Sequence, residues 1–266
     1  MTTAERPGYG LPPAFIAGWL LRAPLRRGRD AGVDGARLLR GRVPAPVVIG
    51  LDLVPASGPF ILVMNHYEST GIRVWWPVLH VSAALRARGD SLPTRWLMAD
   101  RFFRTRWRGI RIPDALVAWL FRRIAHAYGT IVVPRLNPWG RAVAVRRAAA
   151  TLRDPLRPHP VAVTPEAALG SGPVLVRPVP NSAVALAWLS RGAIPLVPVG
   201  VYEDDAGRLT ARFGEPFVLA WDGLTAARAE REALTQRVMA AVAALLPPAL
   251  HGAFAAPEAS AGSPSA

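Results

Sequence analysis

The sequence predicts one α/β domain, built on a mixed, mostly parallel β-sheet that helices flank, with an apolar helix at the N-terminus. Short apolar runs of strand length alternate along the chain with segments whose apolar residues recur at helical spacing. This alternation is typical of a parallel sheet covered by helices. The 266 residues are 51% hydrophobic, which is enough to bury one sizeable core and excludes wholesale disorder.

The first element is an apolar stretch at 11–25, which Arg22 and Pro24 interrupt. It is shorter than the roughly 18–20 apolar residues of a membrane-spanning helix. It also lacks the basic start and the small-residue cleavage site of a signal peptide. Because Trp19 lies within it and Arg26 follows it, the stretch has the features of a helix that lies in a membrane interface. An ordinary helix that covers the core explains it equally well.

Apolar runs bounded by proline or glycine predict the strands, and helical spacing predicts the helices between them. The expected strands lie at 44–53, 59–65, 94–99, 130–134, 160–164, 194–201, 209–213 and 217–220. The expected helices lie at 71–88, 113–128, 137–152, 182–190 and 225–246. We assign residues 1–43 to the N-terminal segment, 44–250 to the α/β domain and 251–266 to a disordered tail.

Polar side chains stand at the ends of three predicted strands. Asn65 and His66 end the strand at 59–65, Arg135 follows the strand at 130–134, and Glu166 follows the strand at 160–164. The carboxyl ends of parallel strands meet at one edge of a sheet, and ligands bind beyond that edge. We therefore expect His66, Arg135 and Glu166 to line one cleft.

The charged residues are unusual in kind. There are 32 basic residues against 18 acidic ones, for a formal net charge of +14, and every one of the 32 is an arginine. The absence of lysine excludes Schiff-base chemistry and a P-loop. The absence of cysteine excludes thiolate nucleophiles, disulfides and cysteine-ligated metals. No spacing of His, Asp and Glu indicates a metal site, so we expect neither a metal nor a resident cofactor.

The segment 86–111 concentrates this charge, with eight arginines against two aspartates and four interleaved aromatic residues. It can be a solvated face, or a membrane-surface patch with aromatic rings at the interface and arginines on anionic headgroups. It can also bind an acidic cofactor such as a phosphorylated acyl carrier. The same residue types suit nucleic-acid phosphates and bases. Since no helix-turn-helix, RNP or zinc-finger pattern accompanies them, no nucleic-acid partner is expected.

Four sequence blocks carry a family resemblance. They are 65–71 (NHYESTG), 129–135 (GTIVVPR), 164–169 (TPEAAL) and 194–200 (IPLVPVG), and the triplet Gly214-Glu215-Pro216 follows them. In this order and spacing they resemble the blocks of the glycerophospholipid acyltransferase family, whose best-known members acylate lysophosphatidic acid.

The resemblance covers about residues 45–220, and its first and third blocks are degenerate. Gly71 stands where the family has the aspartate of its first block. In the third block Ala167 replaces the family's glycine, and Leu169 replaces its arginine. The histidine, the arginine of the second block and the glutamate are retained, as His66, Arg135 and Glu166.

The resemblance implies that His66 is the general base. A histidine suits this role because its ordinary pKa lies near the working pH. His66 would take the proton of an acceptor hydroxyl or amine, which then attacks an acyl thioester, either acyl-CoA or acyl carrier protein. Asn65, Arg135 and Glu166 would bind substrate, with Arg135 as an anchor for a phosphate or headgroup and Glu166 as a pocket-shaping or acceptor-binding carboxylate.

The departures change two of these expectations. With Gly71 in place of the aspartate, Glu68 is the first candidate to orient the His66 ring and Asp100 is the second; the third alternative is that the ring has no carboxylate partner. The loss of the arginine at Leu169 favours a neutral lipid, amino-lipid or glycolipid acceptor over a phosphorylated one.

Taken together, these features predict an acyltransferase of phospholipid or glycerolipid metabolism. Its expected partners are the membrane surface, the acyl donor and the lipid acceptor, and its expected place is the cytoplasmic face of the cell membrane, as a peripheral or monotopic protein. The missing aspartate supports an alternative, a catalytically impaired lipid-binding relative. A nucleic-acid-binding protein would rest on charge alone.

Overall fold

The computed structural model of the protein describes residues 9–22, 28–89, 92–100, 106–107, 110–111, 113–134, 137–167, 172–220 and 227–255. The strands of its central sheet are β1 (Val47–Ile49), β2 (Ile61–Met64), β3 (Arg95–Ala99), β6 (Ile131–Val133), β7 (Val161–Val163), β8 (Leu196–Glu203) and β9 (Leu209–Phe213). A separate two-stranded hairpin consists of β4 (Arg106–Trp107) and β5 (Ile110–Arg111).

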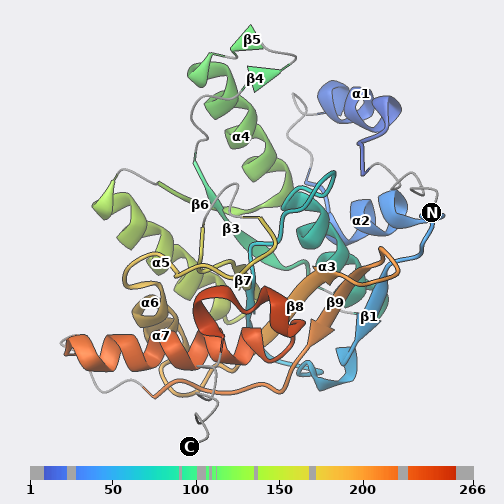
Figure 1. Ribbon diagram of the computed structural model, residues 1–266. Helices are drawn as coiled ribbons and strands as arrows, with labels where there is room; N and C mark the ends of the chain where they lie inside the picture. The colour runs from blue at the N-terminus through green and yellow to red at the C-terminus, as the bar shows by residue number, and fades with distance from the viewer. Residues whose placement is uncertain are drawn as a thin grey trace, which may run out of the picture.

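The seven strands pair in the order β1-β9-β8-β2-β7-β3-β6 (Figure 1). The five strands from β8 to β6 are parallel to their neighbours, whereas β9 runs antiparallel to β8 and β1 pairs parallel with β9. The prediction of a single α/β domain with a mostly parallel sheet is thus confirmed.

Helices cover both faces of this sheet (Figure 1). The helices of the described residues are α1 (Pro13–Arg22), α2 (Ala31–Leu39), α3 (Trp75–Ala87), α4 (Asp114–Tyr128), α5 (Pro138–Leu152), α6 (Ser182–Ser190) and α7 (Arg228–Ala243). Along β2, which is fully buried, Ile61 and Val63 face the core formed with α5, α6 and α7. Leu62 and Met64 face the other core, formed with α2 and α3. Successive strand residues point to opposite faces, so β2 is central to both cores.

Helix α2 packs closely against α3, and the sequence did not predict it. A β-carbon at Gly35 would collide with the backbone carbonyl of Leu79 on α3. Asp30 caps the helix by accepting hydrogen bonds from the backbone N–H groups of Gly32 and Val33. The glycines that lower the helix propensity of this segment are therefore the residues that let the two helices approach.

A partly buried ionic junction connects α1, α2 and α4. The guanidinium of Arg29 donates two 2.7 Å hydrogen bonds to the carboxylate of Asp34 on α2. The hydroxyl of Tyr128, at the end of α4, donates to the same carboxylate at 2.7 Å. Burial, followed by the hydrogen bond to Asp34, raises the pKa of Tyr128. Arg29 also lies 5.3 Å from the ring centroid of Phe15 on α1.

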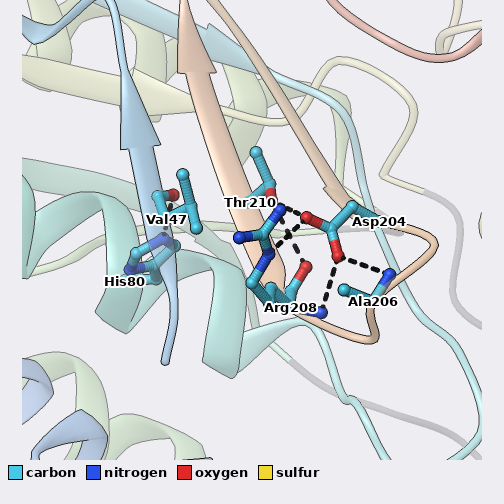
Figure 2. A network of polar contacts seen from close by, with 6 residues as sticks. All are labelled: Val47, His80, Asp204, Ala206, Arg208 and Thr210. Carbon is cyan, nitrogen blue, oxygen red and sulfur yellow. Dashed lines mark hydrogen bonds and ion pairs between the residues drawn. The ribbon is translucent and has the colours of Figure 1, made fainter. Parts of the chain in front are cut away.

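The β1 edge of the sheet is fastened by polar contacts, which Figure 2 shows. Nε2 of His80, on α3, lies 3.0 Å from the carbonyl oxygen of Val47 on β1. Burial lowers the pKa of His80.

In the turn between β8 and β9, the Asp204 carboxylate accepts hydrogen bonds from the backbone N–H groups of Ala206 and Arg208 and from the Arg208 side chain. These contacts fix the one antiparallel hairpin of the sheet.

Two predicted strands differ most from the structure. The run 44–53 forms only β1 and then a short 3₁₀ helix, Leu51–Leu53, because Gly50 takes a left-handed conformation with φ of 69°. The predicted strand at 217–220 is wrong, since Phe217 makes a single bridge to Leu196 and no ladder follows. Near the C-terminus, Gly252–Phe254 forms a 3₁₀ helix whose Phe254 is buried.

Within the described ranges, no helix is both long enough and apolar enough to cross a membrane. Helix α1 lies in the apolar stretch predicted at 11–25. Its Trp19 is buried, whereas Ile16 is 42% exposed. Arg26 lies outside the described residues.

Candidate active site at the carboxyl ends of β2 and β7

Asn65 and His66 directly follow the buried strand β2, and both are themselves buried. The side-chain amide of Asn65 donates to the carbonyl oxygen of Val201 on β8 at 2.8 Å and accepts from its N–H at 2.7 Å. This pair of bonds continues the β2–β8 pairing beyond the last strand residue. Asn65 thereby fixes the backbone at the point where His66 leaves the sheet.

The carboxylate of Glu166 reaches the same point from the neighbouring strand β7. One oxygen accepts a 2.5 Å hydrogen bond from the backbone N–H of His66, and the other accepts a 2.8 Å bond from the N–H of Val176. Burial raises the pKa of Glu166, although both hydrogen bonds favour its charged form. The side chain links the loop after β2, the loop after β7 and the returning segment at Val176, which makes it a positioning carboxylate.

The turn that presents Glu166 is strained at its end. Ala167 donates its N–H to the carbonyl oxygen of Thr164 at 3.2 Å, which closes the turn. Its φ is 45°, in the left-handed region that side chains disfavour. The resembling family has a glycine at this position. Ala167 keeps the left-handed backbone conformation that a glycine adopts without strain.

The loop after His66 ends in a tight turn. Ser69 and Ile72 exchange backbone hydrogen bonds of 3.0 and 3.1 Å, and Gly71 lies between them with φ of 89°. Gly71 is exposed, and nothing lies within 4 Å of a β-carbon built on it. The position that holds the aspartate in the resembling family is therefore an exposed turn in this chain. The Ser69 hydroxyl donates to the carboxylate of Glu203, at the end of β8, at 3.3 Å.

Glu68 is also buried in this loop, at 7% exposure. Its backbone N–H donates to the carbonyl oxygen of Gly172 at 3.4 Å. The segment that contains Gly172 and Val176 thus contacts the His66 loop through Gly172 and the Glu166 carboxylate through Val176. The pairing of Glu68 with the His66 ring stays a prediction, as does that of Asp100.

The structure brings together Asn65, His66, Glu68 and Glu166, which come from the ends of β2 and β7. Arg135 and Leu169 lie outside the described residues. Sequence reasoning missed Val176 and Glu203 as members of this region. Glu203 could have been found from the sequence, because it is an acidic residue at the end of a strongly apolar strand. Val176 could not, because only its backbone N–H takes part.

Within the residues that the structure describes, no group of three or more His, Asp or Glu side chains could hold a metal ion. Among the described residues, this edge offers one imidazole, two buried carboxylates and an amide. Such a set can move protons and hold a backbone in place.

Comparison with known proteins finds likeness among solved structures, but not at the level of sequence families. The sequence matches no protein-family model and no curated protein. Among solved structures, the fold is similar to that of the 1-acyl-sn-glycerophosphate (LPA) acyltransferase PlsC from Thermotoga maritima. The two chains are 16% identical with a TM-score of 0.48, and the match covers 85% of this chain and 86% of the other.

Proposed function

We propose that the protein transfers a fatty acyl group from an acyl thioester to a hydroxyl or amine of a lipid acceptor at a membrane surface. The observation that carries the proposal is the hydrogen bond from the His66 backbone to the Glu166 carboxylate. It joins the first and third of the four sequence blocks, which supports a single site that contains both His66 and Glu166.

In the proposed reaction the His66 imidazole takes a proton from the acceptor hydroxyl or amine. The acceptor oxygen or nitrogen forms a bond to the thioester carbonyl carbon, and the carbon–sulfur bond breaks. The proton then passes to the departing thiolate, which leaves as a free thiol. No acyl-enzyme forms in this scheme, which agrees with a sequence without cysteine. Asn65 and Glu166 keep the His66 backbone in position during the transfer.

The acyl donor would be acyl-CoA or acyl carrier protein, and the acceptor would be a neutral lipid, amino-lipid or glycolipid. Leu169, in place of an arginine, is the basis for this choice of acceptor. The protein would act from the cytoplasmic face of the cell membrane as a peripheral or monotopic protein. No metal and no resident cofactor takes part in the scheme.

The exposed turn at Gly71 supports a second candidate function, lipid binding without turnover. A base that lacks its orienting carboxylate loses orders of magnitude in rate. The two functions differ in one measurable respect, which is the appearance of an acylated product.

The test is acyl transfer from labelled acyl-CoA and labelled acyl carrier protein to a panel of detergent-dispersed lipids. We expect one acceptor class to be acylated, and His66→Ala to abolish the transfer. His126→Ala, which changes an exposed histidine on α4, is the matched control and should keep full activity. Lipid binding with no product from either donor would contradict the enzyme and support the lipid-binding relative. Full activity of His66→Ala would remove His66 as the base.

A further inference from the structure

Helix α4 leaves large apolar side chains in contact with solvent. Leu116 is 53% exposed and Trp119 is 42% exposed. The buried side chains of this helix are Val117, Ala125 and Ala127, so its second half packs more deeply than its first. Adjacent exposed apolar residues of this size are typical of a binding surface.

Arginines share the exposed face with these residues. Leu116, Trp119 and Arg123 follow one another at the i, i+3, i+7 spacing of a single helical stripe. The Arg123 guanidinium lies 5.5 Å from the ring centroid of Trp119, and Arg122 beside it is exposed. Asp114 is the one acidic residue of α4, and its spacing of five from Trp119 places it on a different side.

The position of α4 suits contact with a flat partner. The start of α4 and the β4–β5 hairpin project from the end of the molecule at which α1 also lies (Figure 1). Arg29 fastens α1 to the other end of α4. Its side chain lies against Phe15, and its backbone N–H donates to the carbonyl oxygen of Ala127 at 2.7 Å. Arg29 therefore contacts both helices.

We propose that the α4 face, defined as Leu116, Trp119, Arg122 and Arg123, binds the surface of an anionic lipid bilayer. Leu116 and Trp119 would enter the interface, where apolar and aromatic side chains gain from leaving water. Arg122 and Arg123 would reach the lipid phosphates, and the net charge of +14 would draw the protein to them. The proposal rests on the proposed function only for the idea that the protein works at a membrane.

The experiment measures co-sedimentation of the full chain with vesicles of phosphatidylcholine alone and of phosphatidylcholine with phosphatidylglycerol. No acyl donor is added, so turnover does not affect the result. The test variant is Leu116→Ser with Trp119→Ser, and a second variant is Arg122→Gln with Arg123→Gln. The matched control is Trp139→Ser, because Trp139 on α5 is 81% exposed and so provides an exposed tryptophan outside the α4 face.

We expect the wild-type chain to bind the anionic vesicles at low salt and to be released by high salt. Each double variant should bind about tenfold more weakly, since each removes one of the two interactions that hold the face to the bilayer. Trp139→Ser should bind like the wild type. Because all four residues are on the helix surface, far-ultraviolet circular dichroism should show unchanged helix content in each variant.

Three results would overturn the proposal. The first is no binding of the wild-type chain to anionic vesicles at low salt. The second is equal binding by the wild type and by Leu116→Ser with Trp119→Ser. The third is an equal loss from Trp139→Ser, which would mean that any exposed tryptophan has this effect. A protein without acyl transfer activity that still binds through the α4 face would contradict the proposed function and leave this proposal standing.

Discussion

The backbone N–H of His66 donates a 2.5 Å hydrogen bond to the carboxylate of Glu166, although the two residues are 100 positions apart. The other oxygen of that carboxylate accepts a hydrogen bond from the backbone N–H of Val176, so one side chain positions the backbone of two loops. Glu166 is buried, and its carboxylate accepts this bond from the backbone of the candidate base. We therefore expect Glu166 to affect a reaction at His66 by positioning the His66 backbone.

Replacing Glu166 with glutamine should weaken both the fold and the activity. The amide has one acceptor oxygen, so one of the two backbone N–H groups loses its partner. An unsatisfied buried donor costs about 1–3 kcal/mol. We expect Glu166→Gln to lower the free energy of unfolding by about 2 kcal/mol in urea titration. Glu232→Gln, at an exposed carboxylate, is the control and should change it little.

The pH dependence of stability should carry the signature of Glu166. Its pKa is raised in the folded state, mainly by burial, above the ordinary value of 4.5. The folded protein then holds this proton more tightly than the unfolded chain does. The stabilising contribution of Glu166 is thus full below pH 4.5 and falls as the pH rises toward the raised pKa. Urea unfolding from pH 4 to 7 should show this fall in the wild type relative to Glu166→Gln. A constant difference between the two proteins would contradict it.

Ala167→Gly should make the protein more stable. A left-handed conformation costs a residue with a β-carbon about 1–2 kcal/mol, and glycine avoids this cost. The greater entropy of glycine in the unfolded chain offsets about 0.4–1 kcal/mol. We expect a net gain of about 0.5–1 kcal/mol in the free energy of unfolding. Ala240→Gly, at an exposed position of α7, should instead lose about 1 kcal/mol.

An aspartate at position 71 should not restore the pattern of the resembling family. Gly71 has a φ of 89°, which an aspartate adopts only with strain, and its turn is exposed. Gly71→Asp should cost about 1–2 kcal/mol of stability and should not raise the rate of acyl transfer. Gly28→Asp, at an exposed glycine whose surroundings are open, should be tolerated. A higher rate for Gly71→Asp would mean that the loop rearranges around the new carboxylate.

Glu68 is the residue that we expect to orient His66. Glu68→Gln should then lower turnover far more than acceptor affinity, because it removes the charge that stabilises the protonated imidazole. Steady-state kinetics with the acceptor varied separates the two effects. If Glu68→Gln keeps full activity, the orienting role is refuted.

The junction of Arg29, Asp34 and Tyr128 should respond unequally to its two simplest mutations. Tyr128→Phe removes one hydrogen bond and should cost about 1 kcal/mol. Asp34→Ala leaves the half-buried Arg29 without its carboxylate and should cost about 3 kcal/mol or more. Thermal or urea unfolding measures both. Asp205→Ala, at an exposed position in the β8–β9 turn, is the control, and equal losses at Asp34 and Asp205 would contradict the importance of the junction.

Much of the fold could be predicted from local pattern. The helix predicted at 182–190 is α6 with the same bounds, and the buried run at 59–65 contains β2. Helix α2 escaped prediction because its two glycines lower helix propensity. What stabilises it is the Asp30 cap and the close contact with α3, which no local pattern reveals.

The positions of His66 and Glu166 at strand ends could be predicted from the sequence, but their contacts could not. His66 and Glu166 could be placed at strand ends, whereas their adjacency depends on β2 and β7 being neighbours in the sheet. Asn65 was expected to bind substrate, yet its amide bonds the backbone of Val201, 136 residues later. Distant backbone partners of this kind leave no trace in spacing or composition.

The place of β2 in the sheet has a consequence for synthesis on the ribosome. Ile61 pairs with Val161 on one side and with Leu196 on the other, so neither neighbour exists when β2 emerges. Until most of the chain has been made, the four-residue apolar strand Ile61–Met64 has unpaired edges and no completed core. Such a nascent chain folds late and is prone to aggregate. Its yield in cells should therefore depend on translation speed and on chaperones that shield apolar strands.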